Sequence, residues 1–304
     1  MATADAAVAS PAGRAARARV GRAVEHWLLP LYTLGVTVYL ILPVAVMILF
    51  SFNDPTGRSN LNFRRFSLDA WLNPLGRPGL DDAVRNSLFV AFGSTIVATT
   101  LGTLIALALV RYGFRGRGST NLLIFLPMST PKIVLGSSLL TMFIATTKLP
   151  FVPDGLLYPL NIRTIFIAHV MFNISYVVVT VKARLQGFPR HLEEAAMDLG
   201  ANEWVTFWKV TFPLILPGVV AAGLLAFSLS IDDYVITSFT AGRTATFPLY
   251  IYGAQLRGIP VQVNVIGTMI FVSAVLLVVL TTFWQRRQAA RDFAPVEVLT
   301  APGA

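Results

Sequence analysis

Two adjacent carboxylates lie inside an otherwise apolar stretch of the chain. Asp232 and Asp233 fall deep in a predicted membrane span from Ile215 to Phe239. A charged side chain at the centre of a membrane costs roughly 2.5–3.5 kcal/mol on insertion scales, so intramembrane carboxylates usually serve a function. The functional interpretation is a path for cations. The structural alternative is that one or both aspartates pair with a base, or lie near the outer end of the span in water. Neighbouring residues of an α-helix point about 100° apart, so both can face one spot only where the helix is unwound.

A lysine in another apolar stretch is a candidate partner for these aspartates. Lys132 directly follows Pro131, and Pro127 precedes it by five residues. Prolines free backbone carbonyls, which is typical of a broken membrane helix lining a cavity. We expect Lys132 to pair with Asp232 or Asp233. Such a pair lowers the cost of burying both charges, and it also reduces the negative charge that a cationic solute could use.

A second candidate site lies in the loop from Lys182 to Pro213. The spacing of its apolar residues predicts a short amphipathic helix with an apolar face and acidic residues on a different face. Gly200 is expected to end this helix in a left-handed conformation, and a second helix is expected to begin near Trp204. The small side chains allow close approach of another body. Docking of a protein is favoured over an interfacial helix on lipid, because the stretch is acidic and the cytoplasmic leaflet is usually anionic. The apolar face consists of Leu192, Ala195, Ala196 and Leu199, and the acidic residues are Glu194 and Asp198.

Other chemistries find little support in the sequence. The chain has no cysteine, which excludes disulfides and thiolate chemistry. None of the three histidines, His26, His169 and His191, has a carboxylate at metal-ligand spacing, so we expect no metal site. No lysine occurs in a G-K-[ST] phosphate-binding pattern, so ATP hydrolysis must come from another polypeptide.

The elements that carry these residues are predicted to be six membrane-spanning helices. Hydrophobic residues make up 55% of the 304, and charged residues only 13%, about half the share typical of a soluble domain. We therefore predict an all-α membrane protein with a cytoplasmic tail over residues 1–27, a transmembrane domain over 28–284 and a second tail over 285–304. The first span is taken as uncleaved. The predicted spans are Leu28–Phe52, Ser87–Val110, Asn121–Thr146, Thr164–Val181, Ile215–Phe239 and Val263–Trp284.

The distribution of charge predicts how these spans are oriented. The net charge of +9 comes from arginines and lysines in short clusters between apolar runs, which disfavours a nucleic-acid-binding face. The positive-inside rule then places both termini and the loop from Lys182 in the cytoplasm. The loop Asn53–Arg85 would lie outside, either as a turn-rich connector or as a docking surface for a partner.

The cytoplasmic loop also resembles a known family. Glu194-Ala195-Ala196, Gly200 and Pro213 are similar to the EAA loop of ABC importer permeases, although Val210-Thr211-Phe212 departs from that family's isoleucine-any-leucine tail. In this family the loop forms a coupling helix that fits a cleft on the ATP-binding subunit. The resemblance implies this coupling role for Glu194, Ala195, Ala196 and Gly200, with Asp198 on the same helix.

Further segments resemble the second permease subunit of the spermidine/putrescine importers, over most of the chain from Leu28 to Trp284. They are Phe50–Asn53, Arg111–Gly116, Ser230–Ile236 and Pro248–Tyr252. The resemblance implies a six-span type I importer fold. It also implies that Ser230, Asp232 and Asp233, with the adjoining Tyr234, help pass a polyamine, and that Glu203 shares in coupling. Lys132 departs from this family, which usually has an acidic residue after the corresponding proline.

The resemblance implies a non-enzymatic permease that binds no cofactor itself. Its protein partners would be two ATP-binding subunits that use ATP and Mg, a second permease that completes a heterodimer, and an extracytoplasmic binding protein. The complex would lie in the lipid of a bacterial inner membrane, and no nucleic acid would bind. A permease for a non-polyamine solute is one alternative. Another is an ion- or proton-coupled carrier or channel using Asp232 and Asp233, which would need no ATPase. An intramembrane aspartyl protease is disfavoured, because its two aspartates must stand on different spans.

Overall fold

The computed structural model describes residues 11–146, 153, 157–187 and 189–292. These segments are almost entirely helical, with one isolated antiparallel bridge between Asn53 and Phe66. The chain folds into two compact units. One comprises residues 1–74 and 259–304, and the other residues 75–258.

The first unit holds the two helices nearest the ends of the chain. They are α1 (Pro11–Phe50) and α12 (Val261–Asp292), which contact each other, and the short α2 (Asp69–Leu72), which packs against α12. Gly267 lets the two long helices approach, since a Cβ there would lie 3.0 Å from the Met47 sulfur. In the loop, Asn53 donates to the Asn60 side chain at 2.6 Å, and Phe52 stacks between Phe66 and Trp71.

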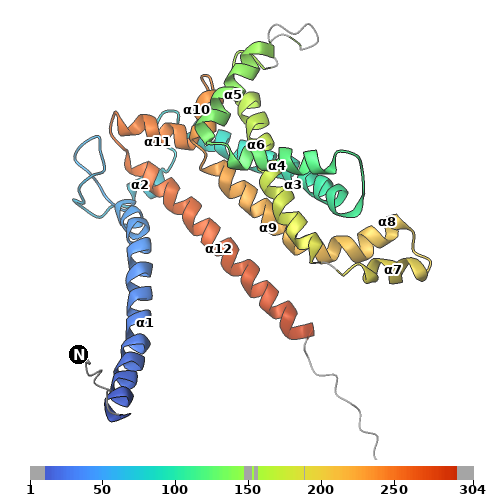
Figure 1. Cartoon of the computed structure of the whole chain (residues 1–304). Helices are drawn as coiled ribbons and strands as arrows, with labels where there is room; N and C mark the ends of the chain where they lie inside the picture. The colour runs from blue at the N-terminus through green and yellow to red at the C-terminus, as the bar shows by residue number, and fades with distance from the viewer. Residues whose placement is uncertain (1–10, 147–152, 154–156, 188, 293–304) are drawn as a thin grey trace, which may run out of the picture. The chain divides into compact units, whose positions relative to one another are not determined.

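The second unit is a bundle around α3, α6 and α9, which pack against one another (Figure 1). Among the described residues, seven further elements complete the unit. The elements are α3 (Leu80–Arg111), α4 (Arg117–Ser129), α5 (Lys132–Ala145), α6 (Ile162–Gln186), α7 (His191–Asp198), α8 (Glu203–Thr206), the π-helix η2 (Phe207–Thr211), α9 (Phe212–Ile231), α10 (Val235–Thr240) and α11 (Phe247–Gln255).

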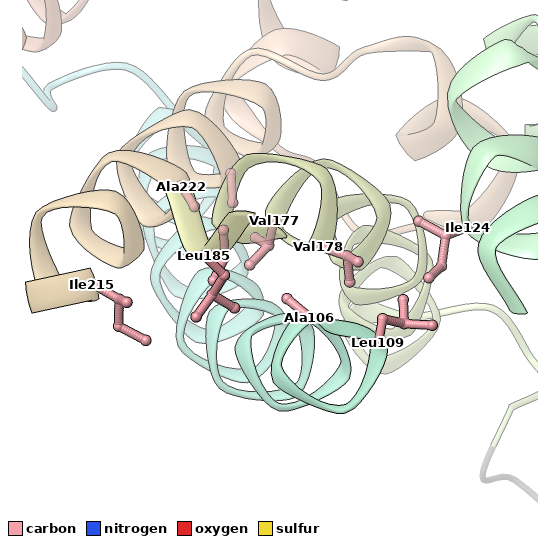
Figure 2. Packing of buried hydrophobic residues seen from close by; sticks show 10 residues of the cluster. Ala106, Leu109, Ile124, Val177, Val178, Leu185, Ile215 and Ala222 are labelled. Atoms are coloured by element: carbon pink, nitrogen blue, oxygen red, sulfur yellow. The ribbon is translucent and has the colours of Figure 1, made fainter. Parts of the chain in front are cut away.

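Small residues allow the central helices of this bundle to pack closely. Figure 2 shows Ala106 of α3, Val177 of α6 and Ala222 of α9 directed toward one another. A Cβ on Gly102 would lie only 2.6 Å from Val177, so the backbones of α3 and α6 are close there. Small residues at helix contacts are characteristic of membrane bundles, in which association depends on van der Waals packing.

Among the described residues, five helices are long and apolar enough to cross a membrane, and the bent pair of α4 and α5 makes a sixth if it is one span. The predicted six spans agree with the upper of these two counts, in which α4 and α5 together form one span. Residues 11–27 of the predicted N-terminal tail are helical, since α1 begins at Pro11, and the first apolar span begins at Trp27. Of the predicted tails, residues 1–10 and 293–304 lie outside the described part of the chain.

The predicted third span is two helices bent by 109°. Both Pro127 and Pro131 were expected to break it, but Pro127 lies inside α4 and the break occurs at Pro131. The residue before a proline is driven toward extended backbone. Thr130 adopts this conformation, with φ −81° and ψ 130°, and so ends α4.

The predicted fifth span is also interrupted. The sequence placed Asp232 and Asp233 deep in the span Ile215–Phe239 and left open whether the helix is unwound there; in the structure α9 ends at Ile231 and α10 starts only at Val235. An Asp233 carboxylate oxygen accepts from the Thr237 backbone N–H at 3.0 Å. The first N–H groups of a helix have no partner within the helix, so a carboxylate here favours a new helix start over continuation of the old one.

Candidate functional site

An ion pair connects the break between α4 and α5 with the break between α9 and α10. Lys132, the first residue of α5, donates from Nζ to Asp233 Oδ1 at 3.0 Å. The Asp233 side chain is fully buried, whereas the Lys132 side chain is 43% exposed. Of the two pairings that the sequence left open, the structure therefore has the one with Asp233. Lys132 also lies 5.9 Å from the centre of the Phe172 ring, within reach of a cation–π contact.

The second Asp233 oxygen is also engaged. Oδ2 accepts from the Thr237 N–H at 3.0 Å and from its hydroxyl at 3.2 Å, and it lies 3.8 Å from His169 Nε2. Both oxygens of the carboxylate thus interact with groups of the protein itself. A buried charge is tolerated when it is paired and hydrogen-bonded in this way.

A chain of buried hydrogen bonds continues from Asp233 across the bundle. His169 on α6 bonds the Thr237 hydroxyl at 2.9 Å through Nε2 and the Ser230 hydroxyl at 2.6 Å through Nδ1. Ser230 in turn lies 3.2 Å from the Ser94 hydroxyl on α3. We call this set of six residues the polar junction: Ser94, Lys132, His169, Ser230, Asp233 and Thr237.

The remaining predicted path residues lie differently. The Asp232 side chain is exposed, and Tyr234 packs against Tyr252 of α11 with ring centres 4.7 Å apart. Ser230 is buried within the polar junction. The structure thus separates two adjacent aspartates, one enclosed by its own chain and one open to its surroundings.

Ser94, His169 and Thr237 were not predicted as site residues. The signal available for His169 was a polar, ionisable residue in the middle of a span, since such residues usually face the bundle interior. Among the described residues, no group of three His, Cys, Asp or Glu side chains could hold a metal ion.

The predicted amphipathic helix in the loop Lys182–Pro213 is α7, and its end has a specific geometry. The Gly200 N–H donates to the Met197 carbonyl at 2.9 Å, and the Ala201 N–H donates to the Ala196 carbonyl at 3.1 Å. This is the Schellman arrangement, which needs a left-handed residue after the helix. Gly200 supplies it with φ +88°.

The predicted coupling residues share this exposed tip. Glu194, Ala195 and Asp198 are exposed, and Ala196 is half-buried. After the turn, the Asn202 side chain accepts from the Val205 N–H at 2.9 Å and caps α8, on which Glu203 is exposed. In Figure 1 the two short helices, α7 and α8, lie side by side.

Glu193, the neighbour of the predicted coupling residue Glu194, links α7 to the bundle. Its carboxylate accepts from Arg111 Nη2 at 2.8 Å and from the Thr211 hydroxyl at 2.7 Å. The side chains of Arg111 and Glu193 are only 15% and 13% exposed. This role could not be predicted from the sequence, because the partners are 82 residues apart and no local pattern marks the pair.

Comparison with known proteins agrees with this arrangement. The family described as "Binding-protein-dependent transport system inner membrane component" matches residues 98–291, so the chain belongs to that family. It is a transport permease subunit of the ABC importer type, not an enzyme.

Two relatives are each 35% identical to the chain. One, over 82% of this chain and 93% of its own length, is the spermidine/putrescine transport system permease protein PotC of Haemophilus influenzae. The other is the putrescine transport system permease protein PotI of Escherichia coli K12, and the match covers 80% of this chain and 85% of PotI.

A solved structure has the same fold. It is a bacterial ABC transporter involved in the import of the acidic polysaccharide alginate, with a TM-score of 0.64, 15% identity and coverage of 88% of this chain and 99% of the other. At this level of identity the likeness concerns the fold alone, and it supports the predicted type I importer fold.

Proposed function

We propose that this chain is one of two permease subunits of an ATP-driven importer that moves a polyamine, or a related small cationic solute, into the cell. The observation that carries the proposal is the exposed tip of α7 and α8, which is anchored to the bundle through Glu193 and Arg111. A small, acidic, rigidly held surface suits docking into a cleft on a separate motor protein. The relatives named for spermidine and putrescine support the cargo class.

The mechanism follows from the position of this surface. Nucleotide binding closes a pair of ATPase subunits, which hold ATP and Mg, and α7 moves with them. Because Glu193 ties α7 to the end of α3 and to η2, the movement reaches the membrane helices. Transport requires the ligands to distinguish the two states of the bundle. No cofactor is proposed for this chain itself.

The cationic cargo is argued from charge. Asp232 presents an exposed carboxylate at a break between helices, where unwound backbone groups are also available. Interrupted helices commonly form solute sites in membrane transporters. On this proposal Asp232 contacts the passing cation, and Asp233 and Ser230 support the local structure from inside.

The remaining partners and the orientation belong to the same proposal. A second, different permease completes the channel, an extracytoplasmic binding protein delivers the solute, and both termini lie in the cytoplasm of a bacterium whose inner membrane holds the complex. A carrier or channel working without an ATPase is the competing function.

The cargo is tested by reconstituting the complete transporter in liposomes with its binding protein. Labelled putrescine and spermidine should accumulate only with ATP, and neither a sugar nor a dicarboxylate should accumulate. Uptake of a neutral or anionic solute in place of the amines would overturn the cationic cargo. Uptake of the amines without ATP would favour the carrier.

A further inference from the structure

We propose that Lys132 is a specificity-determining residue. Its ammonium group acts as a tethered cation that pairs with Asp233, so that Asp232 is the carboxylate left to bind a passing solute. This inference rests on the proposed function and deepens it. It states that the path at the two helix breaks is matched to cations with few ammonium groups, so that a diamine is favoured over a triamine.

The first support is the geometry of Asp233. One of its oxygens accepts from the Lys132 ammonium at 3.0 Å, and the other accepts from the backbone and hydroxyl of Thr237. With its side chain fully buried, this carboxylate has no exposed edge for a solute ammonium. Only by replacing the Lys132 ammonium could a solute reach it.

The second support is the asymmetry of burial in the pair. Lys132 is 43% exposed while Asp233 is buried, so the ammonium lies on the open side of the carboxylate. A solute approaching the break therefore meets the lysine charge before that of Asp233. Like charges repel most where water is partly excluded.

The third support is the charge balance. Counted as formal charges, one lysine and two aspartates give the break one net negative charge. A solute with several ammonium groups is then attracted by one carboxylate and repelled by one ammonium. Each ammonium group beyond those that Asp232 can accommodate adds more repulsion than attraction, which disfavours a triamine relative to a diamine.

The test measures the ratio of initial uptake rates of spermidine, a triamine, and putrescine, a diamine. The complete transporter is reconstituted with its binding protein saturated by one amine at a time. Comparing ratios between variants cancels both the amount of transporter and the preference of the binding protein. A residue with a purely structural role would change both rates together and leave the ratio constant.

Removing the tethered cation should raise this ratio. In Lys132→Met the break gains one net negative charge, and the ratio should rise about two- to fivefold, the size of one exposed charge–charge interaction. The double variant Lys132→Met with Asp233→Asn restores the original net charge and should return the ratio toward the wild-type value. An unchanged ratio in a Lys132→Met protein that reaches the membrane would overturn the inference.

A second variant keeps the inference testable if Lys132→Met fails to accumulate, because it leaves the buried pair intact. Asp232→Asn removes the exposed carboxylate, and the ratio should fall by about two- to fivefold. Asp82→Asn, which removes an exposed carboxylate on α3, is the matched control and should leave the ratio unaltered. An equal ratio in Asp232→Asn and wild type would contradict the inference.

The two proposals fail in different ways. If the wild-type transporter moves neither amine, the proposed cargo fails and the specificity role falls with it. If it moves both amines and the ratios do not respond to these charges, only the role of Lys132 fails.

Discussion

At the residue scale, two neighbouring aspartates have different surroundings. Asp233 is buried and bonded to Lys132 and Thr237, while Asp232 is exposed. The sequence could predict that a charge in an apolar stretch needs a partner, and it named the correct lysine. It could not decide between the aspartates, because that choice depends on where α9 ends and on the orientation of α5.

These surroundings predict different effects when either aspartate is replaced by alanine. Asp233→Ala removes the acceptor of the Thr237 N–H and of the Lys132 ammonium, and it should lower the free energy of unfolding by about 1–3 kcal/mol. Asp232→Ala removes an exposed side chain and should leave stability within about 0.5 kcal/mol while reducing cation uptake. Thermal unfolding of the purified complex and uptake assays separate the two effects. Equal destabilisation by both variants would contradict the assignment.

At the element scale, the long apolar helices were predictable and their interruptions were less so. Hydropathy alone locates a run of about 20 apolar residues. It carries no mark of the break at Asp232, since Val235 and Ile236 continue the apolar pattern. The break at Pro131 was predictable because proline restricts the preceding backbone, but Pro127 is tolerated inside α4.

The helix end at Gly200 gives a test of the coupling surface that involves backbone alone. Nothing lies within 4 Å of a Cβ built on Gly200, so Gly200→Ala should act only through its φ of +88°, at a cost of about 1–2 kcal/mol. Binding of the ATPase subunit to the purified permease should weaken correspondingly. Gly187→Ala at the end of α6 is the matched control, because its φ is −83°. Equal binding by both variants would show that the turn geometry is unimportant.

The link between α7 and α3 predicts an uncoupled phenotype. Glu193→Gln weakens the contact with Arg111, so ATP hydrolysis should continue while less solute is moved per ATP. The exchanged pair Glu193→Arg with Arg111→Glu should recover part of the coupling. The measurement is the ratio of phosphate released to solute accumulated in proteoliposomes. A normal ratio in Glu193→Gln would rule out this residue as the mechanical link.

At the scale of the whole molecule, the count of spans and the family were accessible from sequence, and the orientation is still a prediction. The absence of cysteine makes it directly testable, because any introduced thiol is unique. Leu199→Cys and Leu256→Cys change two strongly exposed side chains of the same unit. A membrane-impermeant maleimide should label the first only from the cytoplasmic side and the second only from outside. Labelling of both from one side would contradict the orientation.

The central claim is that a separate ATPase drives this permease through the exposed tip of α7. The most direct measurement is ATP-dependent amine uptake by the reconstituted transporter carrying Glu194→Lys, which reverses a charge on that surface without touching the buried pair of Glu193 and Arg111. We expect uptake to fall to background while the chain still inserts in the membrane. Uptake that continues at the wild-type rate would contradict the account.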